Sequence, residues 1–429
     1  MEDEQNSWLD FRQENMFQIL TPYEERDIYD KLAEKQRGGK FHVTKSKTIV
    51  GKSSVTDLPD EILFQILTKF PAEDLHDNIR FVCKRWHKLI SSGCFISQHM
   101  QQNKSQLLIV TPVLLPCENR QVKQLEKHVK ALDFNLNTAP IPRMAQQILS
   151  SFNGLILIHD REHRRQLHVV NLANKFSVTL PSCPSACEHV GCGTAITLDP
   201  STSEYKIVHM FADGFGLEIF TLGCPDKAWK RIRGPFRVPE ERPFNVEKFR
   251  WENPVCINGQ FLHWSVGSDE YIVSMNISNE KWRRIHLPGN DRYRYRYDLL
   301  DIEGNLALFY KVSNTQIDVW VLEDYEKQGW IQRYSIMSES RIHGTRSLPE
   351  FRKLHAVTAL EDGHLIMFRH QRGKHDLNDC YCLYDIKQRE LKRSRMKIKR
   401  KTKFIHHKSS LLVCSRNEKL ADKDLKVTV

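Results

Sequence analysis

Four possible metal ligands lie close together near the middle of the chain: Cys183, Cys187, His189 and Cys192. Thiolate and imidazole groups are ligands that zinc prefers, so a zinc site is one chemistry that this segment could support. The spacings match none of the common paired-ligand patterns, and nearby proline and glycine residues are typical of a loop. We therefore expect an irregular loop with reduced thiols rather than a metal site, and we expect no bound cofactor.

Arginine and tyrosine alternate between Asp291 and Asp298. In a strand, this alternation would place Arg292, Arg294 and Arg296 on one face and three tyrosines on the other. Both residue types are frequent in binding hot spots, so the arginines are candidates for binding an acidic partner or target. The alternative, which we favour, packs the tyrosines between neighbouring structural units and leaves the arginines in water.

No familiar catalytic motif is present. The chain has no Gly-x-Ser-x-Gly elbow, no phosphate-binding loop and no His-Glu-x-x-His pair. The paired carboxylates Glu240–Glu241 and Asp298 with Asp301 fall in expected loops or turns, where solvated charge is the usual explanation. Cys380 and Cys382 share one face of an expected strand and are interpreted as small core residues. The sequence therefore predicts a protein without catalytic residues.

The positive charge of the chain is concentrated in one segment. Residues 387–408 contain 11 Lys or Arg and one acid, which accounts for nearly all of the net charge of +11. The rest is almost neutral, so a nucleic-acid binder is not favoured. The run is dense enough to serve as a nuclear-import signal. An equally good interpretation is a solvated outer strand or connection. The candidate import residues are Lys392, Arg393, Arg395, Lys397, Lys399, Arg400 and Lys401.

Length and composition limit the class of protein. With 429 residues, two or more domains are expected, one of them large. No apolar run approaches the 18 or so residues of a membrane helix, and the acidic start at Met1–Glu4 is unlike a secretory signal. An odd count of 11 cysteines favours a reducing compartment. We expect no membrane association and a location in the cytoplasm, the nucleus or both.

Two apolar stripes at helical spacing lie between residues 58 and 90. Residues 59–69 place Ile62, Leu63 and Ile66 on one face, and residues 78–90 do the same with Val82 and Trp86. Asp57 and Pro59 suit the start of the first helix. A unit of about 40 residues buries too little surface to be stable alone, so it should dock onto another surface.

This segment resembles the F-box, most specifically in Leu58-Pro59-Asp60-Glu61-Ile62-Leu63 and Val82-Cys83-Lys84-Arg85-Trp86. The resemblance implies a small three-helix module that binds a Skp-family adaptor and, through it, a cullin of a ubiquitin ligase. The alternative is an ordinary helical hairpin in a larger core. The residues expected to bind the adaptor, some of which must instead pack the module, are Leu58, Pro59, Ile62, Leu63, Ile66, Leu75, Val82, Cys83 and Trp86.

From about residue 105 the pattern changes to short apolar runs separated by turns, which predicts strands. A unit of roughly 50 residues recurs, beginning at Asn153-Gly154, Asn258-Gly259, Glu303-Gly304 and Asp362-Gly363, with a looser copy near Ala195. Such repeats, each with an aromatic residue in its outer part, are typical of propeller blades. The rival architecture is a two-sheet sandwich.

The strings Asn258-Gly259-Gln260-Phe261-Leu262-His263-Trp264 and Lys281-Trp282-Arg283-Arg284-Ile285 resemble the kelch-related, F-box-associated region of plant F-box proteins. We expect six blades, closed by pairing Phe404-Ile405 or Leu411–Val413 with the strand near Leu107–Val110. The predicted domains are a helical extension and linker at 1–50, the F-box and a linker helix at 51–104, the propeller at 105–416 and a polar tail at 417–429.

Together these features predict a substrate receptor of an SCF-type ubiquitin ligase, a multidomain protein with one α-helical and one all-β part. It would act by positioning an unknown target protein rather than by catalysis. A β-propeller enzyme or carbohydrate-binding protein with a helical docking hairpin is the main alternative. A nuclear nucleic-acid binder that uses residues 387–408 is a third.

Overall fold

The computed structural model describes residues 58–103, 106–110, 146–160, 166–185, 192–288, 297–337, 350–360, 363–370, 378–399 and 402–412. The predicted extension at 1–50 and tail at 417–429 lie outside these ranges. The described residues form two compact units: a helical unit of residues 58–103 with Ser409–Leu411, and a β-rich unit from the remainder. Among the described helices, none is long and apolar enough to cross a membrane.

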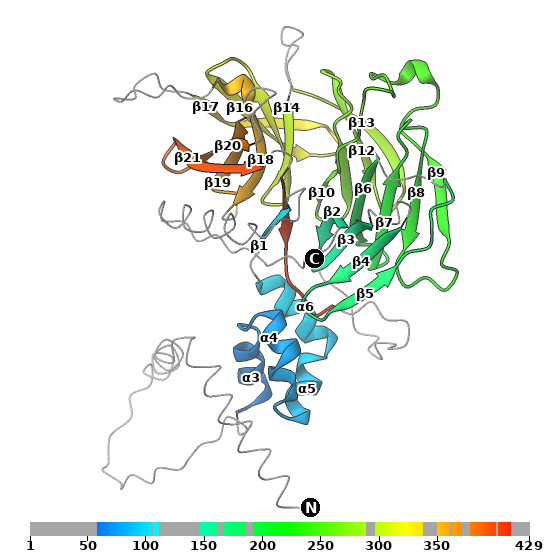
Figure 1. Ribbon diagram of the computed structural model, residues 1–429, viewed down its shortest axis with the longest axis vertical. Helices are drawn as coiled ribbons and strands as arrows, with labels where there is room; N and C mark the ends of the chain where they lie inside the picture. The colour runs from blue at the N-terminus through cyan, green and yellow to red at the C-terminus, as the bar shows by residue number, and fades with distance from the viewer. Residues whose placement is uncertain are drawn as a thin grey trace, which may run out of the picture. The chain divides into compact units, whose positions relative to one another are not determined.

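The helical unit contains four short α-helices and one 3-10 turn (Figure 1). The first helix starts after Pro59, and Asp60 and Glu61 in its first turn interact favourably with the helix dipole. Its residues Leu63 and Leu67, four apart, are fully buried. The elements are α3 (Asp60–Leu67), α4 (Ala72–Asp77), η2 (Ile79–Phe81), α5 (Lys84–Ile90) and α6 (Gly93–Gln102).

The second predicted helix, at residues 78–90, is interrupted. Residues 79–81 form the 3-10 turn η2, and Cys83 is extended, with φ −158° and ψ 167°, before α5 begins at Lys84. The apolar spacing is preserved across this break, so Ile79 and Trp86 are both buried although they belong to different elements. The sequence therefore predicted the apolar face correctly but overestimated the length of the helix.

Three residues from far along the chain complete the helical unit. The side-chain amide of Asn103 donates a hydrogen bond of 2.8 Å to the carbonyl of Ser409. The hydroxyl of Ser409 donates to the carboxylate of Glu73. Ser409, Ser410 and Leu411 are at most 6% exposed. The helical unit is thus built from two segments that are about 300 residues apart in sequence.

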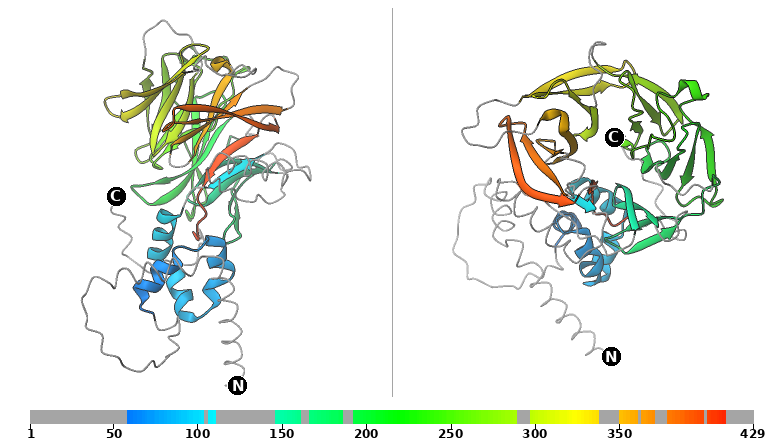
Figure 2. Two further views of the ribbon diagram at one scale, coloured as in Figure 1. Left: turned by 90° about the vertical axis from the view of Figure 1, so that its left-hand side faces the viewer. Right: turned by 45° about the horizontal axis from the view of Figure 1, so that its top comes forward.

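Five four-stranded antiparallel sheets make up most of the β-rich unit, each formed by four strands consecutive in sequence. Figure 2 shows them arranged around a ring. The sheets are β2 (Gln146–Phe152), β3 (Leu155–Asp160), β4 (Leu167–Asn171), β5 (Phe176–Thr179); β6 (Gly193–Asp199), β7 (Glu204–Met210), β8 (Gly216–Thr221), β9 (Trp229–Arg233); β10 (Val255–Ile257), β11 (Phe261–Trp264), β12 (Tyr271–Asn276), β13 (Lys281–His286); β14 (Tyr297–Ile302), β15 (Asn305–Lys311), β16 (Gln316–Asp324), β17 (Gly329–Met337); and β18 (Leu354–Leu360), β19 (Leu365–His370), β20 (Asn378–Asp385), β21 (Glu390–Lys399).

A two-stranded ribbon occupies the remaining position of the ring. β1 (Gln106–Val110) pairs with β22 (Lys403–His407), with Leu108 opposite Ile405 and Ile109 opposite Phe404. β22 contacts both β18 and β2 and so joins the last sheet to the first. The predicted closure is confirmed, but the described residues form five complete blades rather than six, because the closing position holds only this ribbon.

Tight turns join the first two strands of several blades, as the repeated Asn-Gly and Glu-Gly pairs predicted. Asn153, Asn258 and Glu303 all have positive φ, as do the glycines that follow them. Two consecutive residues with positive φ match the right-handed twist of a two-residue hairpin. The recurring pair is therefore the local signal for the first hairpin of these three blades.

Tryptophans on the outer strands of the second, third and fourth blades link each of these blades to the one before it. The indole N–H groups of Trp229, Trp282 and Trp330 donate hydrogen bonds of 2.8 Å to carbonyls of the preceding blade, at Pro181, Arg233 and His286. The outer tryptophan of these three blades therefore has a structural role, because it connects neighbouring blades at the outer rim.

The space between blades is filled by apolar side chains from both neighbours. One cluster joins the second and third sheets and includes Val208 and Trp264, and another joins the fourth and fifth sheets and includes Phe309 and Phe368. Two further clusters join the first sheet to the second and the third to the fourth, and β22 contacts both the last sheet and the first. This arrangement rules out the alternative of a two-sheet sandwich.

A buried ion pair within the second blade is hydrogen-bonded to the third blade. The ammonium group of Lys206 lies 2.6 Å from the carboxylate of Asp199, whose side chain is 1% exposed. The hydroxyls of Ser201 and, from the third blade, Ser278 donate to the same carboxylate. Burial alone would raise the pKa of Asp199, but these hydrogen bonds outweigh burial and hold the pKa well below its usual range.

Candidate adaptor-binding site

Three of the residues predicted to bind the adaptor are part of the core of the helical unit. Leu63 and Leu75 are fully buried, and Trp86 is 4% exposed. They come from α3, α4 and α5, so each of these helices contributes a buried side chain to the core of the unit. These residues hold the unit together and leave little surface for an outside protein to contact.

The other six predicted residues keep part of their surface accessible: Leu58, Pro59, Ile62, Ile66, Val82 and Cys83. Ile62 and Ile66 are four residues apart on α3 and therefore lie on the same side of that helix. Val82 and Cys83 precede α5, and Arg85 ties this segment to the start of α3. Its guanidinium donates to the Asp60 carboxylate at 2.7 Å and to the Leu58 carbonyl at 2.6 Å.

Phe81 is an additional candidate that the sequence analysis missed. Its side chain is 48% exposed, and the guanidinium of Arg80 lies 4.7 Å from its ring centroid. It directly precedes Val82 and Cys83 in the chain. The signal was present in the sequence: Phe81 falls outside the helical spacing of Ile79 and Trp86, so it could not share their buried face.

The arginines proposed to contact a target, Arg292, Arg294 and Arg296, lie outside the described residues. Tyr297, the next residue, begins β14 and is half-buried against apolar residues of the third and fourth blades. Its hydroxyl accepts a hydrogen bond of 3.1 Å from Ser265. Burial raises the pKa of Tyr297 to about 12. This tyrosine therefore packs between blades, as the favoured interpretation of the alternating segment predicted.

Asp298 is not a solvated charge, which corrects the expectation for this residue. It lies in β14, and its carboxylate is 3.1 Å from the Lys311 ammonium and 3.2 Å from Nδ1 of His355. Burial alone would raise the pKa of Asp298, but the hydrogen bond from His355 and the charge of Lys311 outweigh burial and lower it. These three side chains come from the fourth and fifth blades and join them.

Part of the basic segment is regular structure. β21 covers residues 390–399, and β22 begins at Lys403. Lys392 pairs with Glu390 at 3.2 Å. The import candidates Arg393, Arg395, Lys397 and Lys399 belong to β21, whereas Arg400 and Lys401 lie outside the described residues. The run is therefore not a free tail, and its role in nuclear import stays a prediction.

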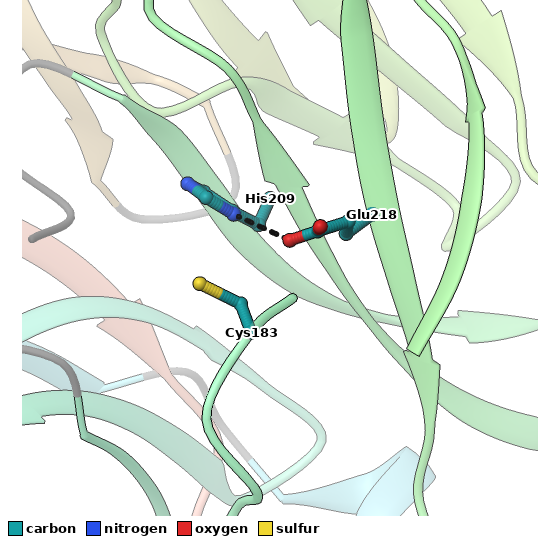
Figure 3. A group of neighbouring side chains, drawn as sticks. All are labelled: Cys183, His209 and Glu218. Atoms are coloured by element: carbon teal, nitrogen blue, oxygen red, sulfur yellow. Dashed lines mark ion pairs between the residues drawn. The ribbon is translucent and has the colours of Figure 1, made fainter. Parts of the chain in front are cut away.

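Of the four possible metal ligands near position 187, the structure describes only two. Cys183 and Cys192 are buried. Cys187 and His189 lie outside the described residues. The structure brings Cys183 next to two residues that the sequence analysis did not consider, His209 and Glu218 (Figure 3). The pair Cys380 and Cys382 is buried in the core of the last blade, as predicted.

Comparison with known proteins identifies two protein families along the chain. Residues 55–98 match the F-box domain, and residues 95–418 match the F-box associated beta propeller domain. Virginiamycin B lyase from Staphylococcus aureus aligns with 61% of this chain and 74% of its own at 9% identity, with a TM-score of 0.34.

The chain is also similar in sequence to F-box proteins of Arabidopsis thaliana. Two of its F-box proteins are 27% and 25% identical to this chain over 239 and 286 residues. The matches cover 50% and 58% of this chain, and 61% and 70% of the relatives. The chain thus spans less than two thirds of the first of these relatives. With its helical unit, its ring of blades and both family matches, the chain belongs to the F-box proteins that contain an F-box-associated β-propeller.

Proposed function

We propose that this protein is a substrate-recognition subunit of an SCF-type ubiquitin ligase. In this proposal the helical unit binds a Skp-family adaptor and through it a cullin, and the propeller binds a target protein. The observation that supports adaptor binding most directly is that Ile62, Ile66, Phe81 and Val82 keep accessible apolar surface, although the core of the helical unit is already formed by other side chains. An F-box domain generally indicates a Skp-type partner.

The physical reason for a partner lies in the size of the helical unit. Its core is formed by a few side chains, among them Leu63, Leu75 and Trp86. Ile62, Ile66 and Phe81 retain apolar surface that would be removed from water on binding, at roughly 25 cal/mol per Å². Binding of an adaptor would therefore also stabilise the folded unit, because it favours the native state by mass action.

The proposed protein acts by positioning and not by bond-making. Transfer of ubiquitin would belong to the other subunits of the ligase, and no residue of this chain is assigned to that reaction. We propose that it works in the cytoplasm, the nucleus or both, where cullin-based ligases would encounter their targets.

A matched pair of substitutions on α3 tests the adaptor interface. Ile66→Asp places a charge within the accessible apolar stripe, whereas Gln65→Asp places the same charge on the neighbouring exposed position. We expect the full chain to co-purify with a Skp-family adaptor at moderate salt, and Ile66→Asp alone to abolish this. Unchanged capture of the Ile66→Asp protein, or no capture of the wild type, would contradict the proposal.

The target-binding role of the propeller needs a separate test. The triple substitution of Arg292, Arg294 and Arg296 by alanine removes three charges from the segment before β14. Partners captured with wild-type and variant chains can be compared by quantitative mass spectrometry. If these arginines bind an acidic target, both chains should capture the adaptor equally and the variant should lose the target; if the arginines are only solvated, as we favour, both chains should recover the same partners. Equal recovery of every partner would remove these arginines from the proposal.

A further inference from the structure

Three buried side chains with metal-binding atoms meet in the first two blades of the propeller. Cys183 follows β5, His209 lies near the end of β7, and Glu218 lies on β8 (Figure 3). Their ligand atoms are all within 4.8 Å of one another. Cys183 is 4% exposed, and His209 and Glu218 are fully buried.

Strand register explains why two of these residues meet. His209 and Glu218 are direct partners in the antiparallel pairing of β7 with β8, so their side chains extend from the same face of the sheet. The Glu218 carboxylate lies 3.5 Å from Nδ1 of His209. The segment that follows β5 then brings the sulfur of Cys183 to the same place. The cluster therefore results from the fold of two blades and not from one local motif.

We propose that Cys183, His209 and Glu218 bind a Zn²⁺ ion. Thiolate, imidazole and carboxylate groups are the donors that zinc uses in proteins. Zinc–nitrogen and zinc–oxygen bonds of about 2.1 Å at the tetrahedral angle place those two ligand atoms about 3.4 Å apart, close to the 3.5 Å between His209 and Glu218. The sulfur would need to move inward by roughly 1 Å to complete the same geometry.

A neighbouring serine holds two of the ligands in place. The backbone N–H of Ser185 donates to one oxygen of Glu218 at 3.0 Å, and its hydroxyl lies 3.0 Å from the other oxygen. The same hydroxyl is 3.2 Å from the sulfur of Cys183 and can donate its single proton to either acceptor. Hydrogen bonds of this kind orient first-shell ligands and tune metal affinity.

Charge and burial favour a metal over two other interpretations. A thiolate and a carboxylate together carry two negative charges, which Zn²⁺ would neutralise in a site without solvent. A histidine–glutamate ion pair would need no thiol beside it. A catalytic Cys–His–Glu arrangement would need access for a substrate, and all three side chains are nearly or fully enclosed.

Metal analysis of the full chain tests the site directly. The protein is purified without added metal, and its zinc content is measured by mass spectrometry for the wild type, Cys183→Ser and Glu218→Gln. Cys380→Ser is the matched control, because Cys380 is similarly buried but lies in the last blade. We expect about one zinc per chain for the wild type and the control, and at least a tenfold loss in the other two.

X-ray absorption of the zinc-loaded wild type keeps the proposal testable even if a variant does not fold. The expected first shell has one sulfur at about 2.3 Å and nitrogen or oxygen at about 2.0 to 2.2 Å. A shell with no sulfur, or with three or four, would overturn the assignment. So would a wild-type chain that holds no zinc, or a folded Cys183→Ser chain that keeps its zinc. None of these results would affect adaptor capture by the helical unit.

Discussion

Phe81 provides the sharpest test of how the helical unit would bind its adaptor. A phenylalanine side chain buries about 200 Å² when it is fully enclosed, and 48% of Phe81 is still exposed. Binding could therefore remove about 100 Å² of apolar surface from water, worth about 2.5 kcal/mol at 25 cal/mol per Å². Phe81→Ser should weaken adaptor binding by roughly 60-fold.

The assay is calorimetry between the full chain and a purified Skp-family adaptor at fixed salt. Gln65→Ser is the control, because Gln65 is exposed on α3 and lies outside the apolar stripe; its dissociation constant should stay within about threefold of the wild type. The free energy of unfolding should fall by less than 1 kcal/mol or so in Phe81→Ser, because the side chain is already half in water. A Phe81→Ser protein that folds normally and binds within threefold of the wild type would refute the assignment of Phe81 to the contact surface.

Three predictions concern the propeller and can be checked by urea unfolding of the full chain. Asp199→Asn leaves Lys206 without its charge partner and should lower the free energy of unfolding by about 3 kcal/mol at pH 7. Because the pKa of Asp199 is lower in the folded state than in the unfolded state, its contribution to the free energy of unfolding is complete above about pH 5 and is lost as pH falls toward the folded pKa. The variant should therefore lose less stability than the wild type between pH 5 and 3. Parallel plots of stability against pH for the two proteins would contradict this. Trp282→Phe keeps an aromatic ring but removes the indole hydrogen bond to the preceding blade, so it should lower the free energy of unfolding by about 1 kcal/mol. An unchanged urea midpoint would show that this hydrogen bond does not stabilise the contact between the two blades. Gly259→Ala should lower the free energy of unfolding by at least 1 kcal/mol more than Gly223→Ala. Both positions have positive φ, but only at Gly259 would the new methyl group lie 2.8 Å from a backbone oxygen. Equal losses of stability in the two variants would show that this steric contact is not the reason.

Local patterns in the sequence were sufficient to predict the elements and the type of fold. The apolar stripe of residues 59–69 corresponds to α3, and the Asn-Gly pairs correspond to hairpin turns with positive φ. Both signals act over a few residues, through side-chain spacing or backbone sterics. The pairing of β1 with β22 was also predicted, but the apolar runs at these positions do not show that the closing position holds two strands rather than four. The blade count was therefore overestimated.

The assignment of the site residues was limited in the same way, because local sequence signals do not show which segments contact one another. A helical stripe shows which face of a helix is apolar, but not whether that face meets the core of its own unit or a partner. Trp86 and Ile66 belong to similar stripes, yet Trp86 is enclosed and Ile66 is accessible. The Cys183 cluster was missed because its partners come from other strands. Glu218, a charged residue within the apolar strand β8, was the available hint.

The Ser409–Leu411 segment has a consequence for how this protein is made. Translation delivers residues 58–103 early, but the three residues that cover this unit emerge only after all five blades. A chain shortened by a premature stop codon or by a carboxypeptidase would lack the Ser409 contacts to Asn103 and Glu73. If the helical unit binds an adaptor as proposed, chains truncated before Ser409 would bind it less well than chains that include these contacts.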